Sequence, residues 1–129
     1  MRIEHLAIWV DDLEGMRNFY TTYFDFRSNE KYTNEKKGFS SYFLSAGEGK
    51  TRIELMTRKD IIHEPTKRGY TKGMAHMAIS VGSKEAVDQL TERLRADKYI
   101  IEGEPRTTGD GYYESVVQDP EGNLIEITV

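Results

Sequence analysis

The hexapeptide HLAIWV at residues 5–10 is nearly repeated by HMAISV at residues 76–81, an offset of 71 residues. Both run His, apolar, Ala, Ile, any residue, Val. The tripeptides IEL at 53–55 and IEI at 125–127 repeat at almost the same offset, 72 residues. Self-similarity at a fixed spacing is the sequence signature of a repeated structural unit. The sequence therefore predicts one structural unit that occurs twice, with a His near the start of each copy and a Glu near its end.

A helix is expected after each His-bearing strand. Asp12 and Ser83, again 71 residues apart, are both suited to cap a helix N-terminus, and an acidic residue follows each by two positions. Apolar residues recur after each cap at the spacing of one helix face. These residues are Leu13, Met16, Tyr20 and Tyr23 in the first copy, and Val87, Leu90 and Leu94 in the second.

Three short extended segments are expected after each helix, with turn residues between several of them. DPEG at residues 119–122 has Pro at the second position and Gly at the fourth, as a type I turn prefers. The polar stretch 58–74 contains one Pro and two Gly and reads as a linker. The predicted strands lie near 26–33, 39–45 and 51–57 in the first copy and near 98–105, 111–118 and 123–129 in the second.

These elements predict an α+β fold built from two tandem βαβββ modules, residues 1–57 and 75–129, which form a curved mixed sheet around a metal pocket. One module has only a small core, so both are expected to form a single domain over residues 1–129, or to complete each other between two chains.

Composition excludes several classes of function. With no cysteine, the chain has no disulfides, no thiolate metal ligands and no cysteine nucleophile; this fits a cytoplasmic protein. No apolar run is long enough for a membrane span or a signal peptide. The net charge is −4 and the basic residues are scattered, so nucleic-acid binding is not expected.

Strand alternation predicts which side chains share a face. In the first strand Leu6 and Ile8 share the face that receives the helix, while His5 and Trp9 share the other. The same alternation puts His76, Glu54 and Glu126 on the faces away from the helices. A right-handed crossover can bring the last strand of a module beside its first. His5, Glu54, His76 and Glu126 are therefore predicted to converge on one concave sheet face.

Two imidazoles and two carboxylates form a ligand set for a divalent Zn, Ni, Mn or Fe ion. A single strand His is more often a surface residue than a ligand, strand Glu is usually solvated, and duplication also copies a structural His. The shared placement of all four on the face without a helix favours a common metal site. The third histidine, His63, lies in the linker and is expected to be exposed.

The sequence resembles the vicinal oxygen chelate superfamily, which includes glyoxalase I, fosfomycin- and bleomycin-resistance proteins, methylmalonyl-CoA epimerase and extradiol dioxygenases. The resemblance covers essentially the whole chain. It rests on HLAIWVDDLEGMRNFYTTYFDF, RIELM, MAHMAISV and DPEGNLIEI, of which the last is the most specific. It implies paired strand-helix-three-strand modules that curl around a metal, often in a homodimer whose site joins modules from two chains.

The bacterial glyoxalase I pattern of His, Glu, His, Glu is matched by His5, Glu54, His76 and Glu126. The resemblance then implies isomerisation of a hemithioacetal, or a related α-hydroxy carbonyl compound, by a metal-dependent lyase or isomerase. Glu126 would be the base that moves the proton, with Glu54 as the alternate. Fosfomycin-type enzymes and extradiol dioxygenases use two His and one Glu, so Glu54 favours the glyoxalase type.

The substrate pocket departs from the glyoxalase pattern. Glyoxalase I typically carries an Arg four residues after the first His, which helps to hold the glutathione carboxylate; here that residue is Trp9. Trp9 suggests a flat or apolar substrate portion, or an aromatic residue of a pocket wall or dimer interface. Arg52 and Tyr112 are further pocket candidates, with a solvated Arg and a sheet-edge Tyr as the alternatives. A drug-sequestering binder without a metal, and a dioxygenase in which Glu54 is not a ligand, remain the other functions that the family offers.

Overall fold

The structure is a computed structural model that describes residues 1–47, 49, 51–62 and 68–129. Contacts divide the chain into two units, Met1–Glu64 and Pro65–Val129, and each is described by itself. The predicted exposure of His63 lies outside the described residues. The prediction that residues 1–129 form a single domain with a linker over 58–74 stays a prediction. The first residue of that predicted linker, Arg58, is the last residue of a strand.

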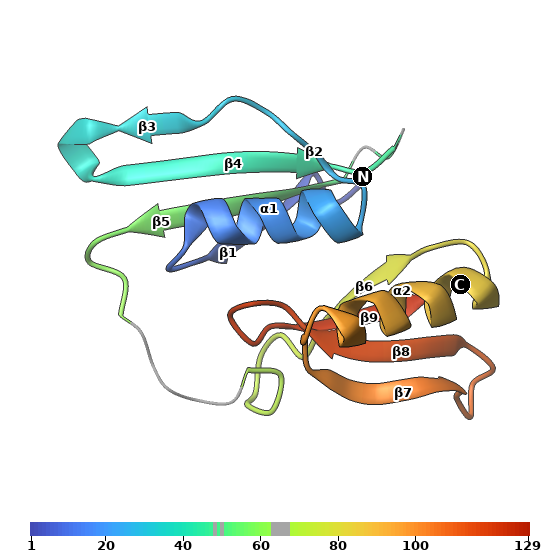
Figure 1. Cartoon of the computed structure of the whole chain (residues 1–129). Helices are drawn as coiled ribbons and strands as arrows, with labels where there is room; N and C mark the ends of the chain where they lie inside the picture. The colour runs from blue at the N-terminus through green and yellow to red at the C-terminus, as the bar shows by residue number, and fades with distance from the viewer. Residues whose placement is uncertain (48, 50, 63–67) are drawn as a thin grey trace. The chain divides into compact units, whose positions relative to one another are not determined.

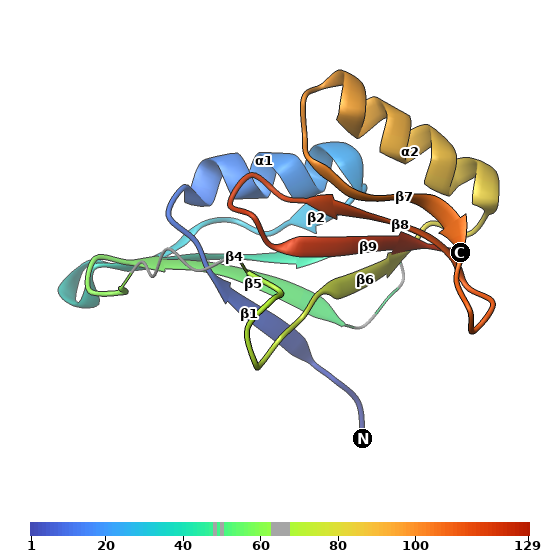
Figure 2. The same cartoon turned by 90° about the horizontal axis from the view of Figure 1, so that it is seen from below.

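The first unit is a mixed sheet with one helix on one face (Figures 1 and 2). The strand order is β1-β5-β4-β2, with β3 also paired to β4, and β1 runs parallel to β5. The parallel pair is the crossover that the sequence predicted, since it brings the closing strand beside the opening one. The elements are β1 His5–Trp9, α1 Leu13–Tyr23, β2 Arg27–Ser28, β3 Tyr32–Asn34, the 3₁₀ turn η1 Glu35–Lys37, β4 Phe39–Ser45 and β5 Arg52–Arg58.

The second unit repeats this plan. Its sheet has the order β6-β9-β8-β7, and β6 runs parallel to β9, as β1 does to β5. The helix α2 lies on one face of that sheet (Figure 2). The elements are β6 Met77–Ser80, α2 Lys84–Ala96, β7 Ile101–Thr107, β8 Tyr113–Gln118 and β9 Leu124–Thr128.

The sequence predicted one strand over residues 26–33, and the structure has two short strands there. Asn29 lies between them, where its backbone N–H donates to the carbonyl of Phe43 and its side-chain Oδ1 accepts from the N–H of Phe43. A side chain that accepts a ladder hydrogen bond in place of a carbonyl interrupts regular strand pairing. The α+β class with repeated strand-helix-strand modules is confirmed by this fold.

Both helices begin where the sequence predicted. The Asp12 side chain accepts a hydrogen bond from the N–H of Gly15, and the Ser83 side chain accepts one from the N–H of Ala86. Each cap satisfies a helix N–H that has no carbonyl partner. Neither described helix has the length and apolar character that crossing a membrane requires.

The apolar face of each helix covers the aliphatic face of its sheet. This burial drives each unit to fold and leaves the opposite sheet face free for polar side chains. In the second unit a buried Thr91 hydroxyl hydrogen-bonds the Ser115 hydroxyl at 2.7 Å, which satisfies both polar groups. The fully buried apolar residues include Met16, Tyr20, Leu44 and Leu55 in the first unit, and Val87, Leu94, Val117, Ile125 and Ile127 in the second.

Candidate functional site

In the first unit, His5 and Glu54 meet on the sheet face opposite α1. The parallel register pairs Ala7 with Glu54, so His5 lies two residues before the partner of Glu54 and on the same face. The Nε2 atom of His5 is 3.7 Å from Oε2 of Glu54. The Glu54 side chain is only 14% exposed, against 39% for His5. This couple is therefore set by strand pairing, as the sequence predicted.

Glu4 holds the other side of the His5 ring. Its Oε2 lies 2.5 Å from Nδ1 of His5, and its Oε1 accepts a hydrogen bond from Nη2 of Arg52 at 2.5 Å. The hydrogen bond from His5, followed by that from Arg52, holds the pKa of the Glu4 carboxyl below its ordinary value. The guanidinium of Arg52 also stacks over Phe43, whose ring meets the His5 ring edge-on. These contacts fix the orientation of the imidazole.

His5 thus has a carboxylate near each ring nitrogen. Carboxylates accept hydrogen bonds and do not donate them, so Nδ1 carries the proton toward Glu4. The lone pair of a neutral Nε2 would then face the negative charge of Glu54. A metal ion held between Nε2 and the carboxylate would accept both lone pairs.

The second unit holds the same couple in the same register. Ala78 pairs with Glu126, and His76 lies two residues before Ala78, as His5 lies two before Ala7. The Nε2 atom of His76 is 3.3 Å from Oε2 of Glu126. The Glu126 side chain is 17% exposed, close to the value for Glu54. The repeat in the sequence is therefore a repeat of side-chain geometry as well.

Glu114 is a neighbour of Glu126 that the sequence reasoning missed. The antiparallel register pairs Val116 with Glu126 and Glu114 with Thr128, which puts both carboxyl groups on one face. Burial, followed by the charge of Glu126 and a hydrogen bond with it, raises the pKa of the Glu114 carboxyl. The DPEG turn between β8 and β9 could have predicted this proximity, because a tight turn fixes the register of the two strands that it joins.

The three predicted pocket residues lie in different settings. Trp9 is on the His5 face, where the Arg58 guanidinium stacks 5.3 Å above its ring and Phe39 meets it edge-on at 6.2 Å. Arg52 is also on this face, but its guanidinium contacts Glu4 and Phe43. Tyr112 is 58% exposed, in the turn between β7 and β8. Arg58, Phe39 and Glu4 were not among the predicted site residues.

The donor atoms fit the first coordination sphere of a small divalent ion. Ligands bound at about 2.0–2.2 Å lie roughly 3 to 3.5 Å from one another, which is the separation within the His76–Glu126 couple and close to that of the His5–Glu54 couple. Within the described part of the chain, no three His, Asp or Glu side chains form a metal-binding group together. Each unit holds one His–Glu couple.

A sequence profile of the Glyoxalase/Bleomycin resistance protein/Dioxygenase superfamily matches residues 2–127. The chain belongs to this superfamily. The match covers nearly the whole chain and confirms the resemblance that the sequence motifs indicated. It establishes the fold family, and this family contains both enzymes and binding proteins.

Individual relatives agree with this assignment. The uncharacterized protein YqjT of Bacillus subtilis (strain 168) is 27% identical over 97% of this chain and 96% of its own. The structure of a possible glyoxalase from Bacillus cereus is 26% identical, with a TM-score of 0.73 over 100% of this chain and 99% of that one. Glyoxalase I from Zea mays has a TM-score of 0.79 at 24% identity over 98% of this chain, which spans only 44% of the maize protein.

Proposed function

We propose that the protein is a metal-dependent lyase or isomerase of the glyoxalase type, which acts on a small substrate with two neighbouring oxygen atoms. The observation that supports this proposal is the recurrence of one His–Glu couple in both units, with the same register and with the donor atoms 3.3–3.7 Å apart. In both copies the carboxylate stands at Nε2 of the His and is largely shielded from solvent, as expected for a pair of metal ligands.

The ligands in this proposal are His5, Glu54, His76 and Glu126, from one chain or from two, and the ion is Ni, Zn, Mn or Fe. The chemistry that such an ion supplies when bound is the polarisation of substrate oxygens, which acidifies the neighbouring C–H group. Glu4 and Arg52 keep the His5 imidazole oriented toward the site.

The proton transfer is assigned to a carboxylate of the chain. Glu126 takes the proton from the carbon that bears the hydroxyl and returns it to the adjacent carbonyl carbon, so that the product is an isomer of the substrate. Its limited exposure keeps bulk water away from that proton during the transfer. Glu54 stands in the same relation to His5 and is the alternate base.

Metal binding is tested first, on the full chain. The metal content of the purified protein is measured, and its thermal unfolding is followed with EDTA and with each of the four ions. An ion at about 100 times its dissociation constant should stabilise the protein by roughly 2.7 kcal/mol, a shift of several degrees in Tm. His76→Ala should lose this shift, whereas His63→Ala should keep it. An equal shift in wild type and His76→Ala would remove His76 from the site.

The reaction is tested separately, with methylglyoxal and a panel of thiols that includes glutathione. Thioester formation is followed by ultraviolet absorbance with metal-loaded protein and with EDTA-treated protein. Metal-dependent thioester formation with one of the thiols is expected. Its absence with every thiol would reject the glyoxalase reaction, while leaving the metal site to the first test.

A second candidate is a binding protein that sequesters a planar molecule without a metal. Three aromatic side chains on the His5 face favour it, since Phe39 contacts both Trp9 and Tyr32. Rings grouped in this way offer stacking surfaces to a flat ligand. Tight binding of a planar drug by EDTA-treated wild type, lost in Trp9→Ala, would favour sequestration over catalysis.

The proposal includes a cytoplasmic homodimer with a small-molecule substrate, and with neither nucleic acid nor membrane as a partner. Light scattering coupled to size-exclusion chromatography measures the oligomeric state. A monomer at micromolar concentration would require all four ligands to come from one chain.

A further inference from the structure

A cleft of about 450 Å³ lies in the first unit, and neither His5 nor Glu54 is among the described residues that line it. The turn between β3 and β4 forms one wall, and the end of β5 forms the other. This volume lies within the range of small-molecule sites in proteins. The described residues that line the cleft are Lys36, Lys37, Gly38, Arg58, Lys59 and Asp60.

Local structure brings these residues together. Asn34 caps the 3₁₀ turn, where its side chain accepts a hydrogen bond from the N–H of Lys37. Gly38 then adopts a left-handed conformation, with φ of 58°, which a residue with a Cβ rarely adopts. The next residue, Phe39, pairs with Arg58 across β4 and β5. The sheet register therefore sets the lysines of the turn against the end of β5.

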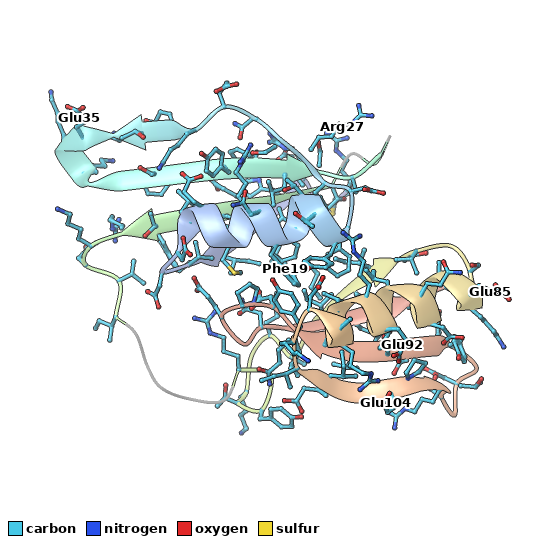
Figure 3. All side chains as sticks on the ribbon, in the orientation of Figure 1. Phe19, Arg27, Glu35, Glu85, Glu92 and Glu104 are labelled. Carbon is cyan, nitrogen blue, oxygen red and sulfur yellow. The ribbon has the colours of Figure 1, made fainter. Side chains whose placement is uncertain are left out.

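The lining carries a strong excess of positive charge. Asp60 is the one carboxylate among the described lining residues, and its Oδ1 pairs with Nε of Arg58 at 2.5 Å. The remaining lining charges are lysine ammonium groups in a chain whose net charge is −4. Glu35 is labelled at the tip of this turn in Figure 3 and does not line the cleft. Several cations gathered at a concave surface attract multivalent anions.

We infer that this cleft binds the phosphate group of a small phosphorylated molecule. A phosphate dianion or pyrophosphate can accept hydrogen bonds from several ammonium groups at once, whereas one carboxylate would leave most of this charge without a counterion. Arg58 lines the cleft and also stacks on Trp9, so a phosphate held there lies beside the indole ring. The inference goes beyond the proposed function and needs no metal, so the two can fail separately.

The test uses EDTA-treated full-length protein, titrated with pyrophosphate and with inorganic phosphate. Trp9 is the single tryptophan of the chain, so its fluorescence reports on Arg58 and the cleft. Isothermal titration calorimetry gives the affinity independently. We expect saturable binding, accompanied by a change in Trp9 fluorescence.

Two double variants with equal loss of charge locate the site. Lys36→Gln with Lys59→Gln removes two lining charges and should weaken pyrophosphate binding roughly tenfold or more. Lys72→Gln with Lys84→Gln removes two lysines outside the cleft and should leave the affinity within about twofold of wild type. All four residues are exposed, so both variants should fold.

Four results would overturn the inference. The first is the absence of saturable binding up to about 10 mM pyrophosphate. The second is binding without a change in Trp9 fluorescence, and the third is an equal loss of pyrophosphate affinity in the two double variants. The fourth is co-sedimentation of the protein with phosphatidate vesicles that the Lys36/Lys59 variant abolishes, because it would assign the cleft to a lipid surface instead of a small molecule.

Discussion

The carboxylate of Glu4 lies 2.5 Å from Nδ1 of His5, on the side of the ring away from Glu54. The ring is therefore oriented before any ion or substrate arrives. Glu4 is itself held by Arg52, so the orientation depends on a chain of charged contacts along one edge of the first sheet. Metal-binding histidines in proteins commonly have such a carboxylate at the second nitrogen.

Glu4→Gln should weaken metal binding, because an amide holds the protonated Nδ1 less strongly than a carboxylate does. We expect a loss of about tenfold in affinity, within the range of 10–100-fold seen for outer-shell partners. Competition with a coloured chelator measures the affinity. Glu30→Gln, which removes an exposed charge from the same unit, is the matched control. Identical affinities for Glu4→Gln and wild type would show that Glu4 does not support the site.

Glu126→Gln should reduce kcat by roughly 10²–10⁴-fold, because an amide cannot accept the substrate proton. Glu54→Gln should reduce kcat less, since the proposal makes that residue a ligand whose amide oxygen can still coordinate. Steady-state kinetics of both metal-loaded variants provide the comparison. A larger effect at Glu54 than at Glu126 would reverse the two roles.

Glu14→Gln should lower stability at neutral pH and have little effect in acid. Lys31 donates a hydrogen bond to the Glu14 carboxylate and Tyr42 donates another, and the Lys31 contact is the main cause that lowers the pKa of Glu14 from its ordinary value of 4.5. A carboxyl whose folded-state pKa is lowered stabilises the fold above its unfolded pKa, and this contribution is lost as pH falls through the folded-state value.

The group is half exposed, so the difference between wild type and Glu14→Gln at pH 7 should be only about 0.5–1 kcal/mol. Urea unfolding of both proteins at several pH values measures it. The difference in unfolding free energy between the two proteins should disappear as pH falls below about 4. A stability difference that is constant over the whole pH range would mean that the charge of the Glu14 carboxylate does not stabilise the fold.

Gly69→Ala should destabilise the second unit by about 2 kcal/mol. Gly69 has φ of +80°, and an added Cβ would lie 2.6 Å from the carbonyl oxygen of Ala75 and 2.5 Å from the Leu124 side chain. Gly109→Ala is the control, since a Cβ there meets nothing within 4 Å. Chemical denaturation should show a change of about 0.5 kcal/mol or less for the control.

Much of the fold was predictable because two patterns in the sequence are strong, the alternation of side chains along the strands and the helical spacing of apolar residues. The alternation around His5 and His76 gave the correct sheet faces, and the two capping residues gave the helix starts. The strand predicted over 26–33 was wrong as one element, because Asn29 takes part in the sheet through its side chain. Propensity alone does not reveal a contact of that kind.

The candidate site was predictable in part. Each predicted His lies beside its predicted Glu, because register is set by the buried aliphatic face of the strands. That the four act as one metal site stays a prediction. Glu4 was missed because it precedes the first strand, where alternation gives no orientation. Glu114 and Arg58 were missed because their partners depend on strands paired across turns.

In both units the opening strand is laid directly against the closing strand of the same unit, and this has a consequence for evolution. Each imidazole meets its carboxylate without help from the other copy. A tandem duplication of one such segment would therefore have copied the His–Glu couple intact. Selection could afterwards modify the loops and surfaces around either pair without having to reinvent the other.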